Sequence, residues 1–508
     1  MENVSSAVIS ILKKLKIDTL FVIPGSLMEI LYDIANDGSF NVISACHEEQ
    51  LGYMAMGYYN ATGKMAAIMV SQGPGETNLI TALATANREQ VPMLVMSSFQ
   101  NDRSKLYFQQ TTGEFHNPDL FSLMTGVCDF CVRMETYLNE DDVKHIVGEV
   151  SKNNGPSYIA VNNSKEDEKG ILQEYINTAE KRQNEDMLGI IGDIVKNCDN
   201  VAFVVGAGVG NAAAGVIAEL QKYDCPIFYT LKAMDKFCIP YKNVMGRIGK
   251  MGNVGCNEYL AEKCCKLIVL GASLNSNTIA KWFRKFMARK GEIVHFGIED
   301  TPVCKSKEFH YYKFDSNDFT GQPISGAPRE ASASPLDRVL HSGDELKSFV
   351  FEAYRPSFIP HFNLQDEEKF MLCTGFGPLG SCISVAAGAA LADRNRIYVV
   401  TCGDGGWLFS GFTLLNLSRH NLPVFVIINV NKEYRTVADG QRNRINQTIA
   451  ADLYLPELSV AGEFFHLRTV FADSIQDIQK AYDEFRCDRK PTVLFMEDKL
   501  YELNDKSE

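Results

Sequence analysis

The sequence has few of the features that place a protein in a membrane, a secretory pathway or a complex with nucleic acid. No run of about 18 apolar residues occurs, so we expect no membrane span. The first residues, Met1 to Ser6, contain no basic cluster ahead of an apolar core, so a secretory signal is not expected. Basic residues are not in excess, because 50 Lys and Arg stand against 63 Asp and Glu. The resulting net charge of −13 argues against nucleic acid or an anionic membrane as the main partner.

Cysteine patterns typical of metal sites are also scarce. The 14 cysteines are scattered along the chain, and the one Cys-x-x-Cys, from Cys128 to Cys131, lies in an apolar run. No second pair of cysteines and no suitably spaced histidines accompany it, which argues against a zinc site. We therefore expect buried thiols in a strand, and a cytoplasmic protein, because free thiols are typical of that reducing compartment.

What is present is the composition of a globular protein of about three domains. The chain has 508 residues, of which 45% are apolar and 22% charged. Short apolar runs alternate with amphipathic stretches in three blocks, which predicts three consecutive α/β domains with mainly parallel sheets. We expect these domains at residues 1–165, 186–317 and 345–500, with a polar linker at 162–186 and a Pro/Ser/Ala/Gly-rich connection between 318 and 344. The predicted strands are residues 19–23, 42–45, 66–70, 93–97, 158–161, 201–205, 227–229, 267–270, 293–296, 397–401, 424–430 and 492–496.

The third block carries the strongest chemical signal. A predicted strand leads into Gly403-Asp404-Gly405-Gly406, and the next one leads into Asn431 and Glu433. A carboxylate and an amide oxygen at the ends of two neighbouring strands can share a hard cation, and the backbone carbonyl of Glu433 can supply a third ligand. The glycines allow a diphosphate to approach backbone N–H groups at a helix N-terminus. The spacing therefore predicts a site for Mg2+ and a diphosphate, whereas the glycines and Asp404 alone would indicate no more than a turn.

This pattern, with the run from His420 to Val424 that leads into the second strand, resembles the thiamine-diphosphate (ThDP)-dependent enzymes of the acetolactate synthase and pyruvate decarboxylase group. The resemblance covers nearly the whole chain. It implies a pyrimidine-binding domain, a middle domain and a domain that binds the diphosphate and Mg2+. The family usually has two adjacent asparagines where this chain has Val430 and Asn431. The second of them is the implied metal ligand, so this departure leaves the metal site intact.

The first block resembles the part of this family that carries the catalytic glutamate. The run from His47 to Gln50 resembles its H-E-x segment, and the run from Gly57 to Gly63 resembles its G-Y-x-x-x-T-G helix end. The resemblance implies that Glu48 exchanges a proton with the cofactor pyrimidine and so activates the thiazolium ring. Glu49 is the competing candidate. Two acids at the start of a helix are also favoured by the helix dipole alone.

Other segments resemble family loops that line the cofactor and the substrate. The loop from Ser71 to Asn78 resembles S-G-P-G-x-T-N, which implies that Gly73 lies beside the cofactor. In Gly377-Pro378-Leu379-Gly380, the resemblance implies that Gly377 contacts the cofactor and that Leu379 is the apolar wedge that bends it. Gln109 is the implied substrate contact, by the resemblance of Phe108-Gln109 to a family Phe-Gln pair. Tyr434 is a second candidate, whose role the sequence leaves open.

The sequence leaves the roles of His47, His116 and Arg435 open. Arg435 suits a substrate carboxylate or a surface ion pair equally well. Residues 354–372 are short and polar where family members have a strand and a cofactor-contacting loop, so the acceptor side of the pocket is expected to differ.

The second block lacks two features of flavin-binding family members. The run from Gly206 to Asn211 approximates GxGxxG, but Asn211 occupies the position of the last glycine. The segment from Gly271 to Asn277 has neither the acids nor the arginine with which acetolactate synthases hold FAD. We therefore expect no FAD, and a flavin or nicotinamide oxidoreductase is disfavoured.

The resemblance implies a ThDP- and Mg2+-dependent enzyme that decarboxylates a 2-oxo acid and joins the remaining fragment to a carbonyl acceptor. Release of a free aldehyde is the alternative, although the adjacent histidines of pyruvate decarboxylases are missing here. A non-catalytic homologue acting as a binding or regulatory subunit is a third possibility, against which the presence of Glu48, Asp404 and Asn431 argues. Because family active sites lie between the first domain of one subunit and the third domain of another, we expect a homodimer or homotetramer.

Overall fold

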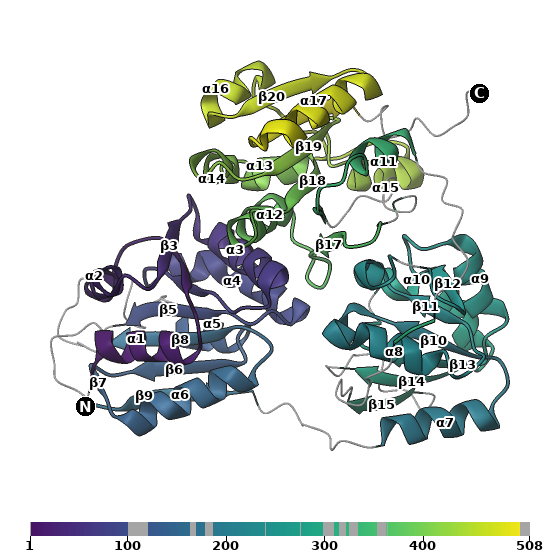
Figure 1. Cartoon of the computed structure of the whole chain (residues 1–508), viewed down its shortest axis with the longest axis horizontal. Helices are drawn as coiled ribbons and strands as arrows, with labels where there is room; N and C mark the ends of the chain where they lie inside the picture. Colours follow the sequence, from purple (N-terminus) through teal and green to yellow (C-terminus); the bar gives the residue numbers. More distant parts are fainter. Residues whose placement is uncertain are drawn as a thin grey trace. The chain divides into compact units, whose positions relative to one another are not determined.

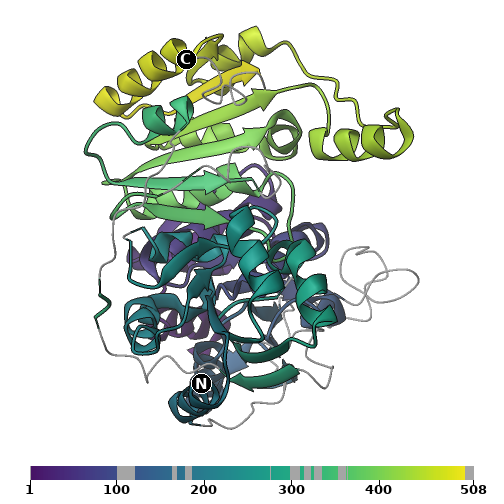
Figure 2. The ribbon, with the colours of Figure 1, turned by 90° about the vertical axis from the view of Figure 1, so that its right-hand side faces the viewer.

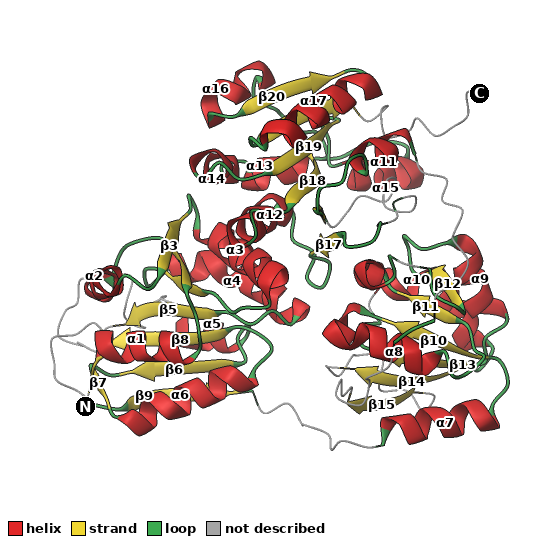
Figure 3. Cartoon of the chain, viewed as in Figure 1, coloured by secondary structure: helices red, strands yellow, loops and turns green. Residues whose placement is uncertain are grey.

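The computed structural model describes residues 2–99, 120–162, 169–177, 186–238, 240–274, 276–297, 309–313, 322–324, 334–352, 362 and 364–497. The chain forms two compact units. The first contains Met1–Asn177, Glu345–Tyr354 and Met371–Leu500, and the second contains Thr178–Asp344 and Arg355–Phe370. Helices alternate with strands in three mainly parallel sheets, two in the first unit and one in the second, so the predicted α/β class is confirmed (Figures 1 and 3).

The N-terminal sheet of the first unit has seven strands in the order β3-β2-β4-β5-β8-β6-β9. Its strands are β2 (Thr19–Val22), β3 (Asn41–Ser44), β4 (Ala67–Met69), β5 (Leu94–Phe99), β6 (Phe130–Met134), β8 (Ser157–Asn162) and β9 (Ile171–Ile176), and β1 (Glu2–Asn3) pairs separately with β7 (Tyr137–Leu138). Its helices are α1 (Val4–Lys14), α2 (Met28–Asp37), α3 (Glu48–Thr62), α4 (Pro74–Glu89), α5 (Leu120–Thr125) and α6 (Glu140–Lys152).

The structure of this sheet tests two predictions made from the sequence. The segment 162–186 was expected to be a linker, but it contains β9, which pairs antiparallel with β6. This expectation was wrong because β9 is an edge strand with mostly exposed side chains, and backbone pairing alone does not require an apolar run. The expectation for the Cys-x-x-Cys is confirmed, because Cys128 and Cys131 are both buried, with Cys131 in β6.

The sheet of the second unit is wholly parallel, in the order β12-β11-β10-β13-β14-β15. Its strands are β10 (Val201–Val205), β11 (Ile227–Tyr229), β12 (Val244–Arg247), β13 (Lys266–Leu270), β14 (Glu292–Gly297) and β15 (Phe309–Lys313). Its helices are α7 (Met187–Asn197), α8 (Ala213–Leu220), α9 (Val254–Glu262), α10 (Ser276–Ala288) and α11 (Pro335–Leu340), with 3-10 turns η1 (Ala207–Ala212) and η2 (Leu231–Lys236).

The glycine-rich run after β10 has a packing role. A Cβ on Gly206 would lie 2.3 Å from Cα of Ala272, so only glycine fits where the ends of β10 and β13 meet. The N–H of Gly208 also donates to the carbonyl of Gly271 at 2.8 Å. Close packing of two strand ends therefore accounts for Gly206.

The C-terminal sheet of the first unit has the order β17-β16-β18-β19-β21-β20 (Figure 2). Its strands are β16 (Lys347–Phe351), β17 (Lys369–Leu372), β18 (Ile397–Gly403), β19 (Val424–Val430), β20 (Arg468–Ala472) and β21 (Thr492–Glu497). Its helices are α12 (Ser381–Ala392), α13 (Asp404–Ser410), α14 (Thr413–Arg419), α15 (Arg435–Ile445), α16 (Ala461–Phe465) and α17 (Ile475–Asp488), with the 3-10 turn η5 (Leu458–Val460). The expectation that residues 354–372 lack a strand was wrong at their end, where β17 forms the edge of the sheet.

Helices α3 and α12 join the N-terminal and C-terminal parts of the first unit at a very close crossing (Figure 1). A Cβ on Gly57 of α3 would lie 1.9 Å from the carbonyl oxygen of Val385, and a Cβ on Gly388 of α12 would lie 1.9 Å from that of Met54. Each helix therefore offers a glycine to the backbone of the other. None of the helices that the structure describes is long and apolar enough to span a membrane.

Candidate functional site

Asp404 and Asn431 lie at the same edge of the C-terminal sheet. Strands β18 and β19 are parallel neighbours, with Gly403 opposite Asn429, so the residues that follow both strands meet at their carboxyl ends. Asp404 is 2% exposed. Its Oδ2 accepts backbone N–H groups of Asn431 at 2.9 Å and Lys432 at 2.6 Å, and its Oδ1 accepts the N–H of Gly405 at 2.9 Å. These bonds fix the carboxylate between the two strand ends.

The segment after Asn431 folds back on itself. Oδ1 of Asn431 accepts the backbone N–H of Glu433 at 3.1 Å. The carboxylate of Glu433 is bound by the guanidinium of Arg442, with one N–H donating at 3.1 Å. Since this ion pair occupies the side chain, a contribution of Glu433 to a metal would come from its backbone carbonyl, as the sequence predicts.

Neighbouring side chains pack closely against two glycines of the motif. A Cβ on Gly405 would lie 3.0 Å from the ring of Tyr434, and a Cβ on Gly406 would lie 2.9 Å from Oε2 of Glu352. The ring of Tyr434 therefore packs against Gly405, which places this candidate substrate contact beside the turn from Gly403 to Gly406, called the diphosphate turn from here on. Arg435 pairs with Asp439 at 3.0 Å, and this favours the surface ion pair over the carboxylate-binding role.

The turn from Gly377 to Gly380, which contains the predicted wedge Leu379 and is called the wedge turn from here on, lies against the diphosphate turn. Gly377 and Gly380 adopt left-handed backbone conformations with φ of 77° and 84°. A Cβ on Gly380 would lie 2.6 Å from Cβ of Phe409 and 3.0 Å from the carbonyl oxygen of Gly406. Leu379, between the two glycines, is only partly buried. It is therefore not an ordinary core leucine, which agrees with a place beside a ligand.

The two candidate catalytic acids point to different neighbours. Oε2 of Glu48 accepts the side-chain amide of Asn78 at 2.9 Å, and its Oε1 lies 3.6 Å from where a Cβ of Gly75 would stand. Oε1 of Glu49 instead accepts the hydroxyl of Tyr53 at 2.8 Å. Glu48 thus faces the turn that the sequence assigns to the cofactor, and Glu49 does not. His47 caps α3, because its Nδ1 accepts the N–H of Glu49 at 3.3 Å.

A buried acid, Glu76, stabilises the turn at Gly73 by a hydrogen bond. Gly73 has φ of 78°, and its N–H donates to Oε2 of Glu76 at 2.8 Å. Oε1 of Glu76 accepts the hydroxyls of Ser97 and Tyr158. Burial is the largest influence on Glu76 and raises the pKa of its carboxyl above the usual range, although these hydrogen bonds oppose the shift.

The residues present fit a bound Mg2+–diphosphate group. A buried carboxylate and an amide side chain lie at neighbouring strand ends beside a glycine-rich turn, and the backbone carbonyl of Glu433 follows two residues after Asn431. Among the described residues, no cluster of three or more His, Cys, Asp or Glu side chains suits a metal by itself. Mg2+ commonly completes its coordination with ligand phosphate oxygens and water, so one acid is compatible with a site of this kind.

The predicted site residues fall into two groups in the first unit. Glu48 and Gly73 lie around the start of α4, and the others lie around the ends of β18 and β19. Gln109 and His116 lie outside the described residues. Sequence reasoning missed Asn78, Glu76 and Glu352. Asn78 and Glu76 stand in the same loop as Gly73 and could have been noticed there, whereas Glu352 has no signal in the sequence.

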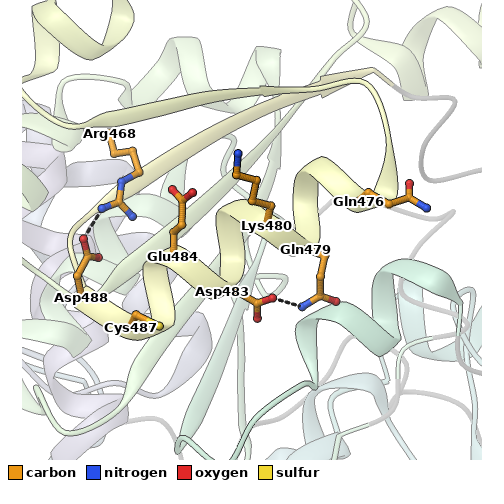
Figure 4. A pocket seen from close by; sticks show the side chains of 8 residues that line it. All are labelled: Arg468, Gln476, Gln479, Lys480, Asp483, Glu484, Cys487 and Asp488. Carbon is orange, nitrogen blue, oxygen red and sulfur yellow. Dashed lines mark hydrogen bonds and ion pairs between the residues drawn. The ribbon is translucent and has the colours of Figure 1, made fainter.

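A surface hollow of about 800 Å3 lies elsewhere, along α17 (Figure 4). Several of its lining side chains are paired with one another, including Arg468 with Asp488, and Gln479 with Asp483 at 3.0 Å. Its charges are mixed, and none of the predicted site residues lines it. We therefore do not assign the cofactor to this hollow.

Comparison with known protein families yields three matches in consecutive order. Residues 2–122 match the thiamine pyrophosphate enzyme N-terminal TPP binding domain, residues 190–312 match its central domain, and residues 356–496 match its C-terminal TPP binding domain. Thiamine pyrophosphate (TPP) is the same compound as ThDP. The first and last matches contain the two groups of predicted site residues.

Similar proteins align along most of their length. The chain is 22% identical to the acetolactate synthase isozyme 2 large subunit of Escherichia coli, covering 89% of this chain and 87% of that protein. It is 21% identical to the acetolactate synthase large subunit of Lactococcus lactis, covering 92% and 88%. It is 26% identical to the mitochondrial acetolactate synthase catalytic subunit of Saccharomyces cerevisiae, covering 95% and 78%.

Proposed function

Because this chain belongs to the thiamine pyrophosphate enzymes and resembles acetolactate synthase large subunits, we propose that it is a ThDP- and Mg2+-dependent carboligase. It decarboxylates a 2-oxo acid and joins the remaining fragment to a carbonyl acceptor. The observation that carries the proposal is the meeting of Asp404 and Asn431 at the ends of two parallel strands, beside a glycine-rich turn.

Each group of residues has a separate task in this proposal. Asp404, Asn431 and the carbonyl of Glu433 hold Mg2+, which neutralises the diphosphate. When bound, ThDP would supply the carbon nucleophile and the acceptor for the electron pair that decarboxylation leaves behind. Glu48 exchanges a proton with N1′ of the pyrimidine ring, and Asn78 holds its carboxylate against the turn at Gly75.

The preference for carboligation rests on the similarity of the chain to the acetolactate synthases of Escherichia coli, Lactococcus lactis and Saccharomyces cerevisiae. Tyr434 is the described candidate for contact with the substrate, because its ring lies over Gly405. Gln109 stays a sequence prediction. FAD forms no part of the proposal, because the segment from Gly271 to Asn277 has neither the acids nor the arginine with which acetolactate synthases hold FAD.

A homodimer is also part of the proposal. Helix α13 begins within the diphosphate turn, at Asp404, and exposed aromatic side chains lie on and after it: Phe409 is 63% exposed and Phe412 is 56% exposed. The ring of Phe464, also 56% exposed, lies 6.3 Å from that of Phe412. Contiguous exposed apolar groups of this kind are typical of association surfaces. We also propose a cytoplasmic location, because exposed thiols such as Cys46, Cys265 and Cys487 persist in a reducing compartment.

Calorimetric titration with ThDP, first with Mg2+ and then with EDTA, tests the cofactor assignment. Mg2+-dependent binding near one site per chain is the expected result, and absence of binding under both conditions would refute the enzymatic proposal. Incubation with pyruvate, with and without an acceptor aldehyde or 2-oxo acid, then tests the reaction. A product that contains the acceptor supports carboligation, whereas free aldehyde that is insensitive to the acceptor identifies a decarboxylase.

Light scattering after size-exclusion chromatography measures the oligomeric state, and a monomer would contradict the homodimer.

A further inference from the structure

Glu352 is a buried acid at the carboxyl end of β16, next to the strand that carries the diphosphate turn. It is 3% exposed. Strand β16 pairs in parallel with β18, and the backbone N–H of Glu352 donates to the carbonyl of Thr401 at 3.0 Å. The side chain therefore starts beside β18, close to where that strand turns into Gly403 and Asp404.

One oxygen of this side chain links the turns on both sides of it. Oε2 of Glu352 accepts the backbone N–H of Gly380 at 3.1 Å and the thiol of Cys382 at 3.1 Å. The same oxygen lies 2.9 Å from where a Cβ of Gly406 would stand. Gly380 ends the predicted wedge turn, and Gly406 belongs to the diphosphate turn. The carboxylate thus lies where these two turns and the end of β16 come together.

We propose that Glu352 is a positioning residue for the cofactor site, which holds the wedge turn against the diphosphate turn before the cofactor binds. This inference rests on the proposed function. A turn that contains two left-handed glycines is weakly restrained by its own backbone, so an external acceptor at Gly380 determines where Leu379 points. Without the carboxylate, the N–H of Gly380 and the thiol of Cys382 lose a buried acceptor, and the turn shifts to recover hydrogen bonds.

The test compares ThDP affinity and thermal stability in four full-length proteins in the presence of Mg2+. These are the wild type, Glu352→Ala, Glu352→Gln and the control Val350→Ala. Val350 is buried on the same strand, so its truncation removes core packing and leaves both turns intact. Calorimetry gives the dissociation constant, and a thermal melt of the cofactor-free protein shows how much stability each variant has lost.

Glu352→Ala is expected to weaken ThDP binding roughly ten- to a hundredfold, because the cofactor must then order the turns itself. Glu352→Gln retains an acceptor oxygen, so its affinity should stay within about threefold of the wild type. Val350→Ala should lose stability and keep its affinity. If Glu352→Ala binds as tightly as Val350→Ala, or if Glu352→Gln is as weak as Glu352→Ala, the positioning role is refuted.

If Glu352→Ala fails to fold, the variant Glu352→Asp tests the positioning role instead. Its carboxylate keeps the charge but is one methylene too short to reach Gly380, so weaker ThDP binding is expected and unchanged binding refutes the role. A wild-type protein that binds no ThDP refutes the proposed function itself. The experiment thereby distinguishes failure of the proposed function from failure of the positioning role of Glu352.

Discussion

The side-chain amide of Asn78 donates a hydrogen bond of 2.9 Å to Oε2 of Glu48. The donor lies in the second turn of α4, and the acceptor is the first residue of α3. Because α4 begins at the Gly73–Gly75 turn, this bond fixes the candidate catalytic carboxylate relative to the loop that is expected to line the cofactor.

Asn78→Ala should reduce turnover by about tenfold while ThDP affinity changes little, since the lost bond orients Glu48 and does not hold the diphosphate. Steady-state kinetics and calorimetry on the same preparation measure both quantities. As a control, Thr77→Ala alters an exposed neighbour on α4 and should leave turnover near the wild-type value. Equal turnover in Asn78→Ala and the wild type would show that Glu48 does not depend on this bond.

Glu48→Gln should lower turnover by about two to four orders of magnitude, because the amide cannot exchange a proton with the cofactor. ThDP binding should persist, since the side chain keeps its size. The matched control is Glu49→Gln, which should retain most activity because Glu49 bonds to Tyr53 instead of facing the turn. Should the two variants behave the other way round, Glu49 would be the proton-exchanging acid.

Asp404→Ala should lower the Mg2+-dependent affinity for ThDP by roughly a hundredfold or more, because the only acid of the predicted metal site is removed. Calorimetry at several Mg2+ concentrations measures this effect. Asp404 also accepts three backbone N–H groups, so a thermal melt is needed to confirm that the variant is folded. Unchanged affinity in a folded variant would place the metal elsewhere.

The second unit should lose stability as the pH rises through the pKa of His341. Burial, the largest influence, lowers this pKa, but hydrogen bonds and charges of Asp337 and Glu368 together raise it to about 9. The ring nitrogens lie 3.1 Å from Asp337 and 2.9 Å from Glu368. Since the folded-state pKa exceeds the unfolded value, the stabilisation is complete below about pH 6.5. It should disappear by about pH 9, at a cost on the order of 3 kcal/mol.

Unfolding by denaturant at pH 6, 7.5 and 9 measures this dependence. His341→Gln should be less stable at pH 6 and should flatten the curve, because two buried carboxylates lose their cationic partner. His145→Gln, which alters an exposed pair with Glu174, should keep the wild-type slope. A His341→Gln curve parallel to that of the wild type would show that this histidine is not the titrating group.

Gly388→Val should destabilise the first unit by about 3 kcal/mol or more, because the added side chain collides with the backbone of α3 at Met54. Gly440→Ala is the control: it lies within α15 with nothing within 4 Å of the new Cβ, so it should be neutral or stabilising by about 1 kcal/mol. Denaturant unfolding compares the two. A Gly388→Val protein of wild-type stability would show that the helices can separate at no cost.

Most of the strands that the sequence revealed are buried, but the match is not complete: the exposed edge strand β3 was predicted, and the buried strand β16 was not. Residues 201–205, 227–229 and 424–430 form β10, β11 and β19 with the predicted bounds, because a parallel strand buried on both faces is a continuous apolar run. Edge strands such as β9 and β20 keep many polar or exposed positions, so no comparable run marks them. Their existence depends on the pairing offered by the neighbouring strand.

The residues of the site also differ in whether the sequence could predict their positions. Asp404 and Asn431 could be placed together because the carboxyl ends of neighbouring parallel strands share one edge of a sheet. The contact of Glu352 with Gly380 is different, since it joins residues 28 positions apart through tertiary packing of a strand end and a turn. The same holds for Glu48 and Asn78, which are 30 positions apart. Only three-dimensional structure reveals such pairs.

The crossing of α3 and α12 has a consequence for the order in which the protein can fold. The first unit is discontinuous, because Met1–Asn177 and Met371–Leu500 share one core while most of the second unit lies between them in the chain. During synthesis, the apolar face of α3 leaves the ribosome long before α12 exists to cover it. The contiguous body of the second unit can therefore mature first, and the N-terminal segment must wait with an exposed helix face. We therefore expect the N-terminal segment to depend on chaperones during this interval, because transiently exposed apolar surface promotes aggregation.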